Sequence, residues 1–126
     1  MSSQSKIYAI GAIIVMAFIA VVLLTQNMAQ PLSVSEYISD GGSLTYTVKG
    51  YGSRLNVALT STNDYMYVKI VVDGQSVYDK NNIYDVNYKY NMGFGYHIIN
   101  IILQNPTLFG LGSRIQVSGI VSVDLF

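Results

Sequence analysis

Residues 7–24, IYAIGAIIVMAFIAVVLL, form an unbroken run of eighteen uncharged, mostly apolar residues near the start of the chain. A helix over this run is about 27 Å long at about 1.5 Å per residue, close to the roughly 30 Å hydrocarbon core of a bilayer. In lipid only internal hydrogen bonding satisfies the backbone, and a helix provides it. The run therefore predicts a transmembrane helix over about residues 7–26. The side chains expected in lipid include those of Ile7, Ile10, Ile14, Phe18, Val22 and Leu24.

A cleaved secretory signal is the alternative for the same run. Signal sequences have shorter apolar regions, of about 7–15 residues, that end at a small-x-small site. The nearest such site here, residues 27–29, begins with Asn27. Retention as an anchor is therefore favoured, with a short cytoplasmic tail and helix in residues 1–30 and an extracytoplasmic domain in residues 31–126. Lys6 is the only basic residue near either end of the run, so the positive-inside tendency places the N-terminus in the cytoplasm.

After Pro31 the period of the apolar residues changes to two, which is typical of half-buried strands. Glycines at 50 and 52 and a glycine-containing loop at 91–95 separate neighbouring runs, and Asp73-Gly74 predicts a type I′ hairpin turn. The pattern predicts a mainly β fold, an antiparallel β-sandwich of the jelly-roll or immunoglobulin-like kind with about eight strands. The expected strands are 34–38, 44–49, 54–60, 65–72, 75–78, 84–90, 96–103 and 115–125.

Composition narrows the function classes. Only 11% of the residues are charged and the formal net charge is zero, so the chain lacks the basic surface that binds nucleic acid. Cysteine is absent, and the domain must be held by packing and strand pairing rather than by disulfides. The expected partners are the lipid bilayer and a protein partner or further copies of the chain. Neither nucleic acid nor a small-molecule substrate is expected.

Candidate catalytic and metal-binding residues are few. His97 is the only histidine, and neither a Gly-x-Ser-x-Gly elbow nor further zinc ligands accompany it. Its expected role is that of a half-buried strand residue. Oxygen ligands at Asp79, Asn81, Asn82 and Asp85 lack the glycine and distal Glu of a calcium loop and are more typical of a turn. The prediction is therefore no enzyme, no catalytic residue, no metal site and no cofactor.

Tyrosine is abundant, with eleven residues, and three of them, Tyr84, Tyr88 and Tyr90, alternate along one expected strand. Rigid aromatic surface is suited to a contact face for a glycan or a protein. The alternative is that these side chains pack as half-buried strand residues. The apolar loop 107–112, with Leu108 and Phe109, either caps the core, touches the membrane or docks a neighbour.

The layout of an N-terminal hydrophobic helix followed by one small β domain resembles archaeal type IV pilins. The resemblance implies helices bundled in a filament core, with β domains outside. Processing in that family follows a charged residue and a small one, whereas here Lys6 directly precedes Ile7. Low charge, no cysteine and many Tyr, Asn and Ile residues are also similar to single-span surface or envelope proteins of thermophilic archaea and their viruses. The expected function is a membrane-anchored, non-enzymatic structural or interaction module, such as a subunit of an envelope complex; the alternative is a filament subunit.

Overall fold

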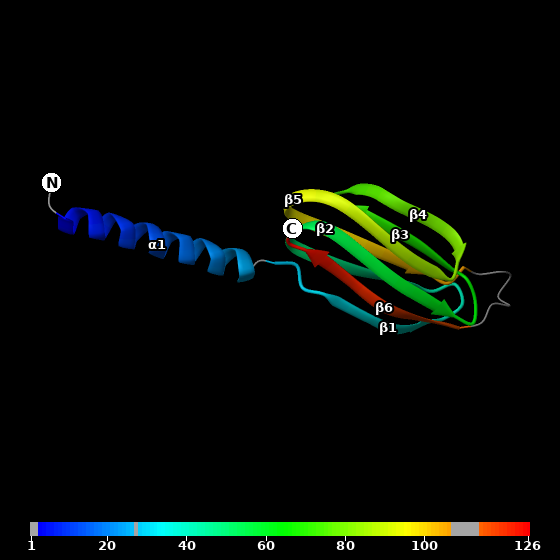
Figure 1. The fold of residues 1–126 in the computed structure, drawn as a ribbon. Helices are drawn as coiled ribbons and strands as arrows, with labels where there is room; N and C mark the ends of the chain where they lie inside the picture. The colour runs from blue at the N-terminus through cyan, green and yellow to red at the C-terminus, as the bar shows by residue number, and fades with distance from the viewer. Residues whose placement is uncertain (1–2, 27, 107–113) are drawn as a thin grey trace.

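The computed structural model describes residues 3–26, 28–106 and 114–126, and within the helix the side chains of residues 9–22. An N-terminal helix precedes a domain built entirely of strands (Figure 1). The predicted order of one helix followed by a mainly β, antiparallel domain is confirmed. The elements are α1 (Ser3–Gln26), β1 (Leu32–Ile38), β2 (Ser43–Thr62), β3 (Met66–Val72), β4 (Gln75–Ile83), β5 (Asp85–Gln104) and β6 (Ile115–Asp124).

The strands form one six-stranded sheet in the order β1-β6-β2-β5-β3-β4, with every neighbouring pair antiparallel. β2 and β5, each 20 residues long, run through both halves of the sheet. In one half, residues 43–52 of β2 pair with residues 95–104 of β5, and β5 pairs on its other side with β3. In the other half, residues 54–62 of β2 pair with β6, and residues 54–60 also pair with 85–91 of β5. The sheet therefore turns over at the middle of β2 and β5, near the end of the domain closest to the helix (Figure 1).

The prediction of about eight strands is wrong, because two pairs of predicted strands are each one long strand. Buried side chains alternate on both sides of Gly52, as predicted, but the alternation shifts by one residue between Gly52 and Leu55. β5 makes the matching shift between Met92 and Gly95. A β-bulge inserts residues without ending a strand and bends it at that point. The glycines predicted to end strands thus mark bulges at which the sheet folds over.

The core lies between the two halves of the sheet. Its buried apolar side chains come from all strands except the edge strand β4, which contributes partly buried residues. Burial of this kind is worth roughly 1.5–3 kcal/mol for each large aliphatic side chain. The largest fully buried side chains are Leu55, Leu59, Met66, Ile70, Ile99, Ile101, Leu103, Ile115, Val57, Val68, Val117 and Val121.

The turns show where local sequence was sufficient. Asp73 (φ 51°) and Gly74 (φ 82°) join β3 to β4, and positive φ at both positions is the type I′ geometry that the sequence predicts. The turn predicted at residues 79–82 is wrong, since these residues belong to β4, which ends at Ile83.

The described part of α1 contributes no residue to the buried core of the sheet domain. Large apolar side chains of the helix are exposed between Ile10 and Val21, with exposed fractions of 51–71%. Figure 1 shows the helix extending away from the sheet. Among the described residues, no helix has both the length and the apolarity needed to cross a membrane.

Candidate functional site

The centre of the candidate site is the bulge on β5. Gly52 pairs with Gly95 and Arg54 pairs with Asn91, so three residues of β5 lie opposite the single Ser53 of β2. Gly93 occupies the middle of the bulge with φ 75°, a conformation that glycine adopts at little cost. The Gly93 amide donates a hydrogen bond to Asn91 Oδ1 at 3.0 Å. The bulge therefore has a defined shape rather than being a gap in the pairing.

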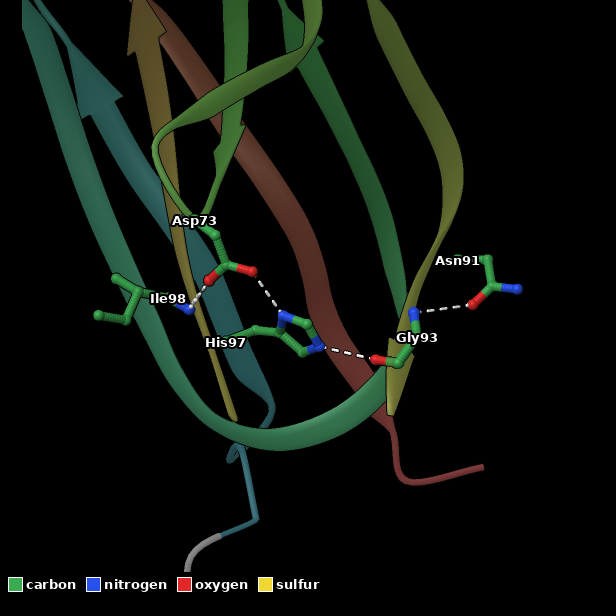
Figure 2. Close-up of polar contacts among 5 residues, drawn as sticks. All are labelled: Asp73, Asn91, Gly93, His97 and Ile98. Carbon is green, nitrogen blue, oxygen red and sulfur yellow. Dashed lines mark hydrogen bonds and ion pairs between the residues drawn. The ribbon is translucent and has the colours of Figure 1, made fainter. Parts of the chain in front are cut away.

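His97 holds this bulge to the β3–β4 turn (Figure 2). Its Nδ1 lies 2.6 Å from Asp73 Oδ2, and its Nε2 lies 2.7 Å from the carbonyl oxygen of Gly93. The second carboxylate oxygen of Asp73 accepts the Ile98 amide at 2.9 Å, and the Asp73 amide donates to the Ile98 carbonyl oxygen at 2.9 Å. These contacts, which we call the His97 clamp, tie together residues 24 positions apart in the chain.

The clamp favours the doubly protonated ring. Both neighbours of the imidazole are acceptors, and the neutral ring has only one N–H to donate. Desolvation, the largest single influence, lowers the pKa of His97, but the hydrogen bonds with Asp73 and Gly93 together outweigh it and raise that pKa above 6.5. The hydrogen bond from His97, with that from the Ile98 amide, holds the pKa of Asp73 below 3.8. Below the raised pKa of His97, the clamp is thus an imidazolium–carboxylate pair.

This geometry is suited to holding two segments together. Both ring nitrogens already bind acceptors, so neither presents a lone pair to a substrate proton. The His97 side chain is 12% exposed, in keeping with the half-buried position predicted for it, whereas the Asp73 side chain is 47% exposed. Figure 2 shows Asp73 approaching the ring from one side and Gly93 from the other.

Four aromatic rings lie on the outer surface around the same bulge, and we call them the aromatic cluster. Tyr51 and Tyr96 are cross-strand partners with ring centroids 5.4 Å apart, edge to face. Phe94, at the end of the bulge, stacks on Tyr51 at 6.4 Å and on Phe126 at 5.5 Å. Three of the four are largely exposed, with exposed fractions of 55% for Phe94, 49% for Tyr96 and 80% for Phe126. The sequence pattern did not predict this cluster, although a phenylalanine between two glycines was a signal for it.

The aromatic cluster lies where the chain passes from the helix into the sheet. Met28 forms a parallel bridge with Tyr51, and the Ala29 amide donates to the Tyr51 carbonyl oxygen at 3.3 Å. Ala29 is buried in the core, which fixes this junction to the sheet. Figure 1 shows the C-terminus at the same end of the domain, the end nearest the helix.

The tyrosines of the predicted contact face differ in their burial. Tyr88 and Tyr90 pack against the core, and the Tyr88 hydroxyl donates to the Val77 carbonyl oxygen at 3.0 Å. Tyr84 is exposed and lies before β5, with its ring centroid 4.2 Å from that of Tyr65. The other two residues of the predicted face, Leu108 and Phe109, lie outside the described residues.

The remaining predicted site residues are placed as follows. Ile10, Ile14 and Phe18 are exposed on α1 and Val22 is partly exposed, while Ile7 and Leu24 belong to the helix but their side chains are not among those described. The described residues include no group of three or more His, Cys, Asp or Glu side chains placed to hold a metal ion.

Comparison with known proteins assigns no family. No protein-family model and no curated protein matches the sequence. Among solved structures, the Yersinia pseudotuberculosis-derived mitogen is similar over 76% of this chain and 87% of its own, with 16% identity and a TM-score of 0.45. A family two carbohydrate esterase from Clostridium thermocellum matches 78% of this chain with 16% identity and a TM-score of 0.44, and one from Cellvibrio japonicus matches 77% with 12% identity and a TM-score of 0.40. This chain covers only 31% and 34% of those esterase chains, and at such scores none of the three carries a functional argument.

Proposed function

We propose that this protein is a non-enzymatic interaction module that its N-terminal helix anchors to a membrane, with the β domain outside the cytoplasm. One observation carries the proposal: the described part of the helix exposes eight large apolar side chains while the sheet domain encloses a core of its own. Apolar surface left in water is costly, at about 25 cal/mol per Å². Lipid around residues 7–24 would remove this surface from water.

The site chemistry supports a binding role over a catalytic one. The only histidine has both ring nitrogens engaged, and exposed aromatic rings lie around the same bulge. Aromatic rings supply large, rigid contact area at low entropic cost. The module therefore acts by contact, as a subunit of a membrane or envelope assembly.

Charge substitution in the helix tests the anchor. Lysine at the centre of a membrane helix costs roughly 2.5–3.5 kcal/mol, so the double variant Ile14→Lys, Phe18→Lys should lose about 5 kcal/mol or more of membrane preference. We expect the wild-type chain and the matched variant Ile14→Leu, Phe18→Leu to stay with sedimented membranes after alkaline washing. The lysine variant should move to the supernatant. Wild-type chain in the supernatant would refute the anchor. In a separate test of orientation, protease added to intact cells should cleave the β domain and leave the N-terminal tail uncut.

A filament subunit is the second candidate, since helices of neighbouring copies would cover the same apolar side chains. Examination of extracellular material sheared from cells distinguishes the filament subunit from the anchored module. Fibres that contain the chain, seen by electron microscopy, support the filament. Full-length chain that remains in the cell membrane after shearing supports the anchored module.

A further inference from the structure

We propose that the aromatic cluster of Tyr51, Phe94, Tyr96 and Phe126 is a second membrane contact, which inserts into the headgroup region of the bilayer beside the helix and fixes the orientation of the β domain. This inference rests on the proposed membrane attachment and adds a lipid-binding surface on the domain itself.

Chain connectivity brings the cluster to the lipid. The helix ends at Gln26, and Met28 is already bridged to Tyr51. The two-residue step from Gln26 to Met28 spans at most about 7 Å, and paired strands lie about 4.8 Å apart. Tyr51 therefore lies within about 12 Å of the end of the helix. With the helix in lipid, the cluster is held at the depth of the membrane–water interface.

The chemistry of the cluster matches that location. Tyrosine is enriched at membrane interfaces because its apolar ring and polar hydroxyl suit the boundary, and phenylalanine is typical of the apolar face of interfacial segments. The outward residue Ile98, 45% exposed, extends the apolar surface beside Tyr96. Lys49 is exposed two residues before Tyr51 and provides a cation for lipid phosphate.

The His97 clamp keeps the cluster in place. His97 holds the carbonyl group of Gly93, the residue directly before Phe94 (Figure 2). His97 itself directly follows Tyr96 in the chain. Asp73 Oδ2 lies 2.6 Å from His97 Nδ1, and below the raised pKa of His97 the imidazolium compensates the charge of Asp73, so that the pair places little net charge near the lipid. The clamp therefore acts as a positioning device for Phe94 and Tyr96.

Single tryptophans test the contact, because the chain contains no tryptophan and each probe is read without background. The full chain is reconstituted in phosphatidylcholine vesicles with and without brominated acyl chains, carrying either Phe94→Trp, Phe126→Trp or Tyr84→Trp. Tyr84 is an exposed control position whose carbonyl oxygen accepts the Ser61 amide near the C-terminal end of β2, whereas Tyr51 of the cluster lies at the middle of that strand.

For the first two variants we expect emission shifted to shorter wavelength and strong quenching by brominated chains, with no change for the control. Unquenched emission from both variants, in chains that still sediment with the vesicles, would overturn this inference and leave the anchor intact. Failure of every variant and the wild type to sediment would instead reject the anchor.

Two other results would also overturn the inference. Equal quenching at all three positions would show that the domain has no preferred orientation on the bilayer. The Phe94→Trp variant could also emit at short wavelength in detergent without vesicles and lose that emission when the protein is diluted. This result would assign the cluster to contact between copies of the chain.

Discussion

Replacing Asp73 by asparagine removes the charge that His97 Nδ1 binds while leaving an oxygen for the Ile98 amide. Hydrogen bonds to charged groups contribute about 1.5–3 kcal/mol when buried. The Asp73 side chain is 47% exposed, which screens the pair, so we expect a loss of about 1–2 kcal/mol of unfolding free energy. For a domain of this size that loss lowers the thermal midpoint by about 4–16 °C.

The pH dependence separates the clamp from a general effect of the substitution. The pKa of His97 is raised above 6.5 in the folded chain, so its stabilisation is complete below pH 6.5 and is lost as the pH rises through the folded pKa. The pKa of Asp73 is lowered below 3.8, so its stabilisation is present above pH 3.8 and is lost as the pH falls through the folded pKa. The clamp is therefore strongest between about pH 3.8 and 6.5.

Thermal unfolding of the full chain in mild detergent, followed by circular dichroism across this range, is the assay. We expect the wild-type midpoint to fall on the alkaline side of the window, and His97→Gln and Asp73→Asn to lack that fall. The double variant should be no less stable than the less stable single variant, because the two side chains form one interaction. An alkaline fall of unchanged size in His97→Gln would show that the clamp is not its source.

Two further predictions concern the sheet. Gly119→Ala should prevent folding or lower the unfolding free energy by several kcal/mol, because φ is 149° and an added Cβ would lie 2.0 Å from the carbonyl oxygen of Ala58. The control Gly11→Ala, with nothing within 4 Å of the new Cβ, should leave the unfolding midpoint of the sheet unchanged. Leu55→Ala, at a fully buried position, should lower the unfolding free energy by about 2–5 kcal/mol in denaturant titration, whereas Ile120→Ala, 47% exposed, should cost less than about 1 kcal/mol. Equal losses in either matched pair would contradict the described packing.

Features encoded by neighbouring residues could be read from the sequence. Alternation identified the inward sides of both halves of β2, and Asp73-Gly74 identified the type I′ turn. A glycine inside a strand pattern favours a bulge or a close approach of another backbone, and the structure places the Ala58 backbone against Gly119. Each of these depends on backbone conformation or on a period of two, both of which are local.

Features encoded by distant residues could not be read in this way. A glycine that breaks an alternating run predicts a loop as well as it predicts a bulge, and only the partner strand decides between them. His97 and Asp73 are separated by 24 residues, and Phe94 meets Phe126 from the far end of the chain, so neither contact leaves a local pattern. Tyr88 and Tyr84 look alike in sequence, yet one packs on the core and the other is exposed.

We expect the β domain to be complete without the helix, and the helix to serve an apolar partner outside the domain. The most direct test of this expectation compares the unfolding midpoint of the full chain in detergent with that of a chain lacking residues 7–24. We expect the shortened chain to be a folded, monodisperse β protein with the same midpoint. Aggregation of the shortened chain, or a midpoint lowered by many degrees, would contradict this expectation and make the helix part of the domain core.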